Sequence, residues 1–428
     1  MEPQMTENEK GRQEKRRTVP ARCPPVPSGP PLRPGWRRES FAVRVVTPMF
    51  GGGPRPGEND PVTLVRGASV RGHLRFWWRA TRGAAYRDAK ALYEREGAIW
   101  GTTKTPSRVT VQVKVLDEGR RVPVSRGHPC AYVLFPFLQQ EMRGTQGHVG
   151  VVFDLTLEYK EGLREDVMAA LWAWVNFGGI GARTRLGCGA LFCEALSAPA
   201  AAVPQDVRDW YASSQGEYGW EPPAEPAAWP TLPPPDWLVV GSGGGREPER
   251  AWAEVVRVLQ EFRQGGAPDR RGRRQGRSVG SSGRRPLWPE GRALRAGRLG
   301  GRPKSGRAED LPPGFPRAEL GLPIVLRGGE RPKTLEPGGG RKRMASPVIL
   351  KPLVLSSGKA LPIALRLRTE SLDGVRLGET EYGPESIRNP AFARDARSPL
   401  HGRTKTGSAL EAFMVFARER LEKGGKRS

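Results

Sequence analysis

Cysteine, histidine and long apolar runs are all scarce in this chain of 428 residues. The four cysteines (Cys23, Cys130, Cys188, Cys193) form no CxxC pair, and the polar N-terminus shows no signal-peptide pattern. We therefore expect a reducing, cytoplasmic setting. The scattered histidines lack zinc-site spacing, so neither a metal nor another cofactor is expected. Because no run of about 18 apolar residues occurs, no membrane partner is expected either.

Positive charge, glycine and proline are abundant instead. Lys and Arg number 70 against 45 Asp and Glu, which gives a formal net charge of +25. A surface this basic attracts polyanions, because displaced counterions supply much of the binding free energy. Nucleic acid is the first candidate partner. With 55 Gly, 42 Pro and 37% hydrophobic residues, part of the length is expected to be loop or disordered segment.

The length and the composition shifts predict two domains with irregular segments around them. Residues 1–39 are polar and rich in proline, which predicts a disordered tail. Residues 40–197 form the first predicted domain, and residues 198–250 a Pro/Gly-rich linker with little to pack. Residues 251–428 form the second predicted domain. Its basic Gly/Arg-rich insertion, 263–307, is expected either to bind single-stranded nucleic acid or only to aid solubility.

Apolar periodicity in the first domain predicts strand, helix, strand, strand, helix, strand, with Gly72 and Gly83 breaking or kinking the first helix. The ranges are 41–47, 69–96, 107–116, 150–160, 163–177 (an amphipathic helix) and 189–196. This βαββαβ order predicts an α+β, ferredoxin-like or RRM-like fold, with two helices on one face of an antiparallel sheet and the other face open to a ligand.

The second domain is expected to be α+β as well, with its first strand and helix obscured by the insertion. Its visible patterns are a helix at 251–263, ordered chain from 317 to 328, two strands joined by a tight turn, and a closing helix. The strands are 343–355 and 360–370, and the closing helix is 408–422.

A glycine-rich segment, NFGGIGARTRLGCGAL (176–191), follows the second helix of the first domain. A nucleotide loop is disfavoured, because the segment follows a helix and matches neither GxGxxG nor GxxxxGK[ST]. A helix end and hairpin would explain the glycines by their positive φ angles. A cradle for a nucleic-acid backbone would also use the arginines as phosphate donors, and we favour it. Its candidate residues are Gly178, Gly179, Gly181, Arg183, Thr184, Arg185 and Gly187.

Arg71, Arg75 and Arg79 recur every four residues in RGHLRFWWR, which on a helix makes one basic stripe. We expect this stripe to bind nucleic acid and at least one of the neighbouring tryptophans to pack in the core. His73 raises the alternative of an acid–base catalyst acting on RNA. A histidine in a basic helix is more often a surface residue or another nucleic-acid contact.

The segments TPMFGGG (47–53), VRGHLRFWWRA (70–80), IWG (99–101) and the glycine-rich segment together resemble the RAMP superfamily. Within it they resemble the first subunits of type III-B (Cmr) CRISPR effector complexes. RAELGLPIVL (317–326) and RMASPVILKPL (343–353) are similar to the second half of those subunits. The resemblance covers about 41–194 and 317–370.

This resemblance implies two fused RAMP domains, each a modified ferredoxin-like fold. It also implies a non-catalytic subunit near the 3′ end of the CRISPR RNA that helps capture target RNA. The implied partners are CRISPR RNA, target RNA and other Cmr-complex RAMP subunits, with the glycine-rich segment and the RGHLRFWWR helix lining the RNA path. Two alternatives stay open: a metal-independent RAMP endoribonuclease that processes CRISPR precursor RNA, and a general basic RNA-binding chaperone.

Overall fold

The computed structural model describes most of the chain from residue 32 onward. The described ranges are 32–53, 57–139, 145–200, 203–264, 287–295, 314–326, 332–396 and 398–423. Within these ranges no helix is both long and apolar enough to cross a membrane. The predicted tail, 1–39, lies outside them up to residue 31. The predicted end of the tail at residue 39 is wrong, because strand β1 (Trp36–Val45) already begins at Trp36.

The first half contains the predicted βαββαβ unit. Its sheet has the order β2-β5-β1-β6, with every neighbouring pair antiparallel. The last strand is shorter than the sequence predicted, only two residues. A hairpin of β3 and β4 and the short helix α4, none of them predicted, are inserted between β2 and β5. The bounds are β2 (Val109–Asp117), β3 (Arg120–Pro123), α4 (Ala131–Leu134), β4 (Gln146–Val149), β5 (Val152–Lys160) and β6 (Leu191–Phe192).

The predicted first helix is two helices. Helix α2 (Gly67–Ala80) runs through Gly72 without a break, so that part of the prediction is wrong. The break comes near Gly83, where the 3-10 turn η1 (Arg82–Ala85) leads into α3 (Ala89–Trp100). Asp88 caps α3 by accepting a hydrogen bond from the Ala91 N–H at 2.8 Å. This break turns α3 back beside α2.

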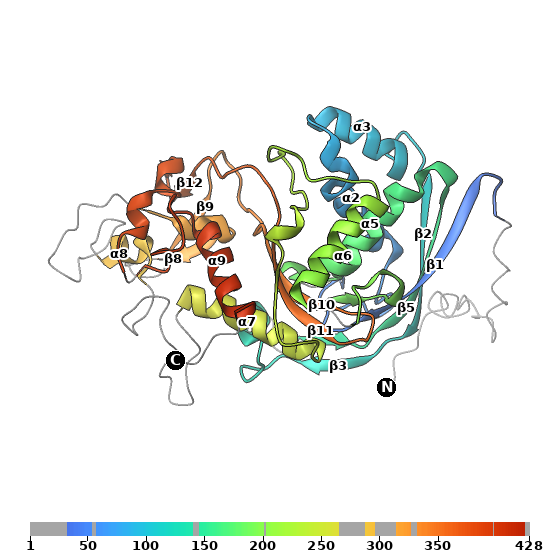
Figure 1. The fold of residues 1–428 in the computed structure, drawn as a ribbon, viewed down its shortest axis with the longest axis horizontal. Helices are drawn as coiled ribbons and strands as arrows, with labels where there is room; N and C mark the ends of the chain where they lie inside the picture. The colour runs from blue at the N-terminus through green and yellow to red at the C-terminus, as the bar shows by residue number, and fades with distance from the viewer. Residues whose placement is uncertain are drawn as a thin grey trace, which may run out of the picture.

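The second half repeats part of the same unit. Its sheet has the order β10-β11-β7, with helices α7 and α9 on one side (Figure 1). Helix α7 is the helix predicted at 251–263, and strand β7 is the first strand, which the sequence pattern did not reveal. The described residues add no fourth strand to this sheet. The bounds are β7 (Val239–Val240), α7 (Pro248–Gln264), β10 (Val348–Val354), β11 (Ala360–Arg366) and α9 (Ala409–Leu421). The predicted hairpin and closing helix are confirmed.

The sheet of the second half is buried on both faces. Every residue of β10, VILKPLV, is buried. Ile349 and Leu353 belong to the core that contains helix α5 (Arg164–Phe177), whereas Val348 and Leu350 belong to the core of α7 and α9. A continuous apolar run is typical of a strand covered on both sides. Helix α5 is itself buried at every position from 166 to 177, so the predicted amphipathic character is wrong.

Residues 198–250 pack closely, which corrects the expectation of a linker with little to pack. Helix α6 (Pro204–Glu217) lies beside α5 in Figure 1, and its Tyr211 is fully buried. Trp220 and Leu232 are buried as well. Proline at the first position of α6 is compatible with a helix start, so the proline content concealed a helix.

A small four-stranded sheet projects from the second half, at the left of Figure 1. Its order is β13-β12-β9-β8, and α8 (Pro289–Arg295) lies beside it. Most of the basic insertion 263–307 lies outside the described residues. In the described part Trp288 is buried and donates from Nε1 to the Arg263 carbonyl at 3.1 Å, so this part does pack. The strands are β8 (Ile324–Leu326), β9 (Lys333–Pro337), β12 (Val375–Leu377) and β13 (Thr380–Tyr382).

Candidate nucleic-acid interface

The glycine-rich segment lies at the joint between the two halves. Gly187, at φ 85°, lies so close to the second half that a Cβ would be 2.5 Å from the Trp252 ring and 2.9 Å from the Leu350 carbonyl oxygen. Trp252 donates from Nε1 to the Leu186 carbonyl at 2.7 Å. The Thr47 hydroxyl donates to the Gly187 carbonyl at 2.6 Å. Gly187 therefore allows close backbone packing and is not exposed to RNA.

Gly178 and Gly179 also have a packing role. A Cβ on Gly178 would be 2.5 Å from the Trp174 carbonyl oxygen and 2.6 Å from the Trp77 Nε1. Trp174 donates from Nε1 to the Gly179 carbonyl at 2.9 Å. Both glycines are buried. At this end of the segment the geometry favours the helix-end interpretation over the phosphate cradle.

Lys351 of β10 reaches across the joint to the end of α5. Its Nζ donates to the Val175 carbonyl at 3.2 Å and to the Gly178 carbonyl at 2.8 Å. The side chain is fully buried, and burial lowers its pKa to about 7. It thus supplies donors to carbonyls that a helix end leaves without partners. The sequence signal, a single lysine within the apolar run VILKPLVL, was not recognised.

The two arginines of the segment have different surroundings. The Arg185 guanidinium donates to the Ser346 carbonyl and lies 5.6 Å from the centre of the Phe76 ring, so it joins the two halves. Arg183 has φ 61°, and among the described residues it is the one non-glycine residue with positive φ. Its guanidinium lies 5.6 Å from the centre of the Phe135 ring.

Arg183 is the arginine whose polar atoms are less satisfied. Its Nε is buried and has no hydrogen-bond partner among the described residues. Burial lowers its pKa, because a desolvated cation is less stable than a hydrated one. Thr184, the next residue, opens the 3-10 turn η5 (Thr184–Leu186), and its carbonyl accepts from the Gly187 N–H at 3.1 Å.

The predicted arginine stripe faces α3. Arg75 and Arg79 both pair with the Glu96 carboxylate, at 2.6 and 2.7 Å. Arg71 donates to the Trp100 carbonyl. The three residues do share one face of α2, but each already has an acceptor from α3, so the stripe is not a row of unpaired cations. Their neighbours Trp77 and Trp78 are buried, and the prediction of a core tryptophan is confirmed.

A pocket of about 340 Å³ lies at the start of α2, and we call it the glycine pocket. Gly51, at φ 85°, and Gly181, at φ 86°, bring two backbone segments to it. Helix α2 begins at Gly67 without a side-chain cap, and Ser69 of its first turn lines the pocket. Unpaired N–H groups of a first helical turn favour anions. The lining is Met49, Gly51, Gly52, Thr63, Leu64, Arg66, Ser69, His73, Ile180, Gly181 and Ala182.

Arg66 and His73 are the ionisable residues of this lining. The Arg66 guanidinium donates to the Gly52 carbonyl and to the Asp60 carboxylate, which fixes the glycine turn against α2. His73 stacks on Trp174 with ring centres 5.9 Å apart, and burial lowers its pKa, which favours the neutral imidazole. The described lining contains no carboxylate and no second histidine, so it offers His73 no acid–base partner.

Arg66, Gly51 and Gly52 were not among the sequence candidates. The run GGG after the first strand was a usable signal, because glycines at positive φ let a backbone approach a ligand closely. The open face of the first sheet was also expected to take a ligand. It carries polar side chains of both charges, such as the Arg38–Glu158 ion pair, whereas Phe41 of the same strand packs on the core side.

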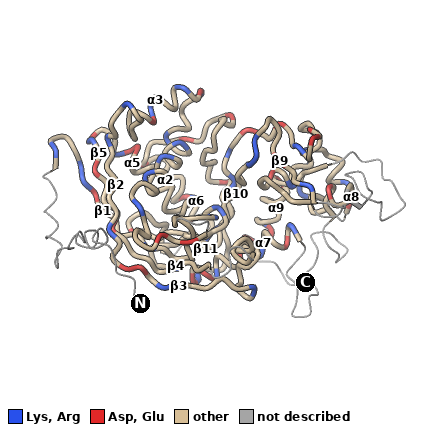
Figure 2. The backbone as a smooth tube through the Cα atoms, turned by 180° about the vertical axis from the view of Figure 1, so that it is seen from behind, with Lys and Arg blue, Asp and Glu red and all other residues tan. Residues whose placement is uncertain are grey.

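Positive charge is spread over both halves and mixed with acidic residues, as Figure 2 shows for the described chain. Part of the net charge of +25 lies outside the described residues. Residues 265–286 alone contain seven Arg and one acidic residue, Asp269. The glycine pocket is thus a local site whose lining has a cation and no anion, rather than part of a uniformly basic face.

The chain is similar to proteins of known family. Residues 42–192 match the RAMP superfamily. The subunit Cmr1-1 of Pyrococcus furiosus is 33% identical over 134 residues, which are 30% of this chain and 40% of that protein. The subunit Cmr1-2 of the same organism is 27% identical over 181 residues, which are 36% of this chain and 95% of that protein.

The fold is similar to a solved structure as well. The crystal structure of Cmr1 from Pyrococcus furiosus in its apo form matches with a TM-score of 0.50 and 18% identity. The match covers 78% of this chain and 89% of that one, so it includes both halves. The α+β fold class is confirmed. Residues 42–192 are thus similar to the RAMP superfamily, and the fold as a whole is similar to that of Cmr1.

Proposed function

We propose that this chain is a non-catalytic RNA-binding subunit of a type III-B (Cmr) CRISPR complex. The similarity to two Cmr subunits and the RAMP domain support this assignment. In the proposal the chain contacts CRISPR RNA, target RNA and other Cmr-complex RAMP subunits. It lies near the 3′ end of the CRISPR RNA and helps to capture the target.

The observation that carries the RNA-binding part is the half-buried Arg183, which directly follows Ala182 of the glycine pocket lining. A buried guanidinium with an unsatisfied Nε, held in a left-handed conformation, is costly to the protein alone. A phosphate oxygen that accepts from the terminal nitrogens of Arg183 would neutralise this charge. The exposed Gly181, two residues before Arg183, and the first turn of α2 across the glycine pocket offer backbone N–H groups to the same strand.

Such a site binds RNA through its backbone. Phosphate contacts position a nucleic acid without reading bases. This suits a subunit of a guided complex, because base pairing with the guide supplies the sequence specificity. The site therefore accepts any spacer sequence.

The test is RNA binding by Arg183→Asn, since asparagine tolerates the left-handed backbone. We expect roughly tenfold weaker binding to a single-stranded RNA, the effect of one charge-assisted hydrogen bond. The slope of log affinity against log salt should fall by about 0.7. Fluorescence anisotropy across a salt series measures both. Arg44→Ala, on an exposed position of β1 away from the pocket, is the control for loss of one charge.

Affinity and salt slope equal to those of the control would remove Arg183 from the RNA path. The geometry does not support the endoribonuclease alternative, because burial favours neutral His73 and the described pocket lining offers it no acid–base partner. It requires metal-independent cleavage of repeat RNA that His73→Ala abolishes.

A further inference from the structure

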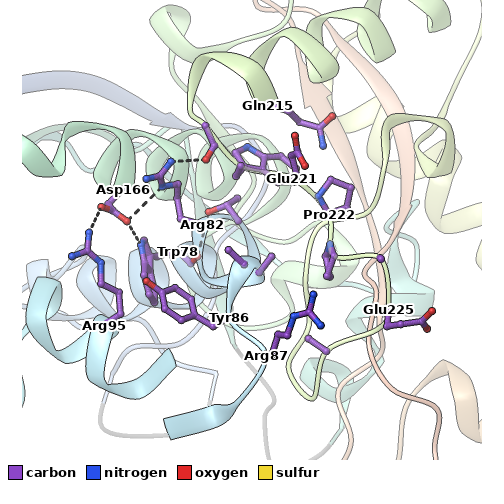
Figure 3. Close-up of a pocket in the computed structure, with 18 of the residues that line it drawn as sticks. Trp78, Arg82, Tyr86, Arg87, Arg95, Asp166, Gln215, Glu221, Pro222 and Glu225 are labelled. Atoms are coloured by element: carbon purple, nitrogen blue, oxygen red, sulfur yellow. Dashed lines mark hydrogen bonds and ion pairs between the residues drawn. The ribbon is translucent and has the colours of Figure 1, made fainter. Parts of the chain in front are cut away.

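A second and larger cavity, of about 1290 Å³, lies at the other end of α2. It opens between η1 and residues 220–227, WEPPAEPA, which we call the strap (Figure 3). Helix α2 has 14 residues, so about 20 Å separates this strap pocket from the glycine pocket. Small-molecule sites usually measure about 300–1,000 Å³, so the strap pocket has room for a ligand of nucleotide size or somewhat larger.

One wall of the strap pocket is a fixed polar cluster. The buried Asp166 carboxylate accepts from Trp78 Nε1 at 2.7 Å and from Arg95 at 3.0 Å. The Nε of Arg82 is 3.6 Å from the same carboxylate. Asp166 is therefore fully engaged, whereas the Arg95 side chain is 40% exposed and keeps donors for a ligand.

The opposite wall is the strap, which hydrogen bonds hold in place. Arg368, just after β11, donates to the Ala224 carbonyl at 2.6 Å. The Glu370 N–H donates to the Ala227 carbonyl at 3.3 Å, and five residues after the strap the Leu232 N–H donates to the Ala80 carbonyl at 2.8 Å. The strap is thus tied to both halves of the protein, and the pocket is formed before any ligand arrives.

Several groups between these walls lack partners among the described residues. Trp220 is 3% exposed, and its Nε1 has no acceptor. Arg87 is exposed and has no ion pair or hydrogen bond within the described chain, and neither have Glu221 and Glu225 of the strap. In Figure 3, Tyr86 and Arg87 lie between the Asp166 cluster at one end and Glu225 at the other. A buried donor without a protein acceptor is available to a polar group that enters the pocket.

We propose that the strap pocket binds a nucleotide. Its phosphate would meet Arg87 and Arg95, its base would lie against the ring of Tyr86, and the N–H groups of the base would donate to Glu221 or Glu225. A nucleotide supplies acceptors at one end and donors at the other, as the two walls require. An acidic peptide would be repelled by the strap carboxylates, and a basic peptide by the arginines.

The nucleotide has two sources that share this chemistry, a base of bound RNA and a free mononucleotide. The RNA source rests on the proposed function, whereas the free mononucleotide does not. The first experiment therefore titrates the full chain with 5′-AMP, GMP, CMP and UMP by calorimetry. Arg87→Ala should weaken the best of them about tenfold, as loss of a charge-assisted hydrogen bond does. The control Lys90→Ala removes a charge from an exposed position of α3 and should leave it unchanged.

A second variant separates recognition of a base from attraction of a phosphate by the direction in which its nucleotide affinity changes. Glu221→Gln combined with Glu225→Gln removes the acceptor charge of the strap, so a base that donates to it should bind several-fold more weakly. If only the phosphate is bound, loss of negative charge strengthens binding and the proposal is wrong. Thermal unfolding of each variant shows whether it folds as the parent does.

A second arm identifies the source. RNA carrying 4-thiouridine should crosslink to the peptide that contains Tyr86 if the base comes from RNA, and Arg183→Asn should leave the mononucleotide titration unchanged. If no mononucleotide binds and no crosslink reaches the pocket, the proposal fails even where Arg183 still binds RNA. Loss of a protein subunit from the complex in Arg87→Ala, with mononucleotide binding intact, would show a protein-docking site instead.

Discussion

The packing role of Gly187 predicts a large effect of the substitution Gly187→Ala. Alanine at φ 85° enters the left-handed region, which costs about 1–2 kcal/mol. Its Cβ would lie 2.5 Å from the Trp252 ring, and Trp252 cannot move away without losing its hydrogen bond to the Leu186 carbonyl. Overpacking of this kind costs about 1–3 kcal/mol. The free energy of unfolding should therefore fall by about 2–5 kcal/mol.

Thermal unfolding followed by tryptophan fluorescence measures this effect. At about 2 °C per kcal/mol for a large chain, the midpoint should fall by roughly 4–10 °C. Gly72→Ala is the matched control, because Gly72 is exposed on α2 and a Cβ there meets no atom within 4 Å. That control should be neutral or stabilising by up to about 1 kcal/mol.

RNA binding completes the test. If Gly187→Ala kept its full stability and instead bound RNA more weakly, the glycine would serve a phosphate cradle, and the assignment of this part of the segment to the domain joint would be refuted. An equal drop of stability in Gly72→Ala would show that the effect is not specific to the joint.

Three further predictions concern charged side chains at the same joint and between α2 and α3. The folded-state pKa of Lys351, about 7, lies below the usual lysine value, so the unfolded chain binds the extra proton above pH 7. Stability should therefore rise with pH, by about 2 kcal/mol from pH 7 to 9, and urea titrations of Lys351→Met should lack this rise. Arg185→Ala should lower the free energy of unfolding by about 1–2 kcal/mol and leave the RNA salt slope unchanged, because Arg185 bonds the second half. Glu96→Gln should cost about 1–3 kcal/mol by leaving Arg75 and Arg79 poorly paired. Anisotropy should show unchanged RNA affinity for Glu96→Gln, whereas tighter binding would mean that the arginines face RNA.

The spacing of apolar residues predicted most of the helices and strands that are buried on one face or on both faces. The βαββαβ order of the first half and the hairpin of the second were predictable, because strands alternate and doubly covered strands read as apolar runs. The start of β1 was missed because four polar residues, RRES, follow Trp36 without the alternation that is typical of a strand. Those residues pair with β5 at the polar end of the sheet, where tertiary pairing and not local pattern decides the strand.

The site was harder to predict because its partners are distant in the chain. The arginine stripe of α2 has the predicted helical phase, but Glu96 lies on another helix and the spacing of the arginines carries no information about it. Composition also gave a wrong prediction at 198–250, because proline at the start of a helix was interpreted as a sign of a loop. The glycines of 178–187 were singled out as RNA contacts, yet Gly187 packs against a strand more than 160 residues later in the chain.

The packing of α5 against the sheet β10-β11-β7 of the second half has a consequence for the order of events during synthesis. Helix α5 needs β10 and β11 on its outer side, and these strands leave the ribosome only after about 170 further residues, since they begin at Val348. At about 5–20 residues per second this delay is on the order of 10–35 s. Over that interval the apolar outer face of α5 is bare in the nascent chain. We therefore expect the first half to complete its packing only when the polypeptide is nearly complete.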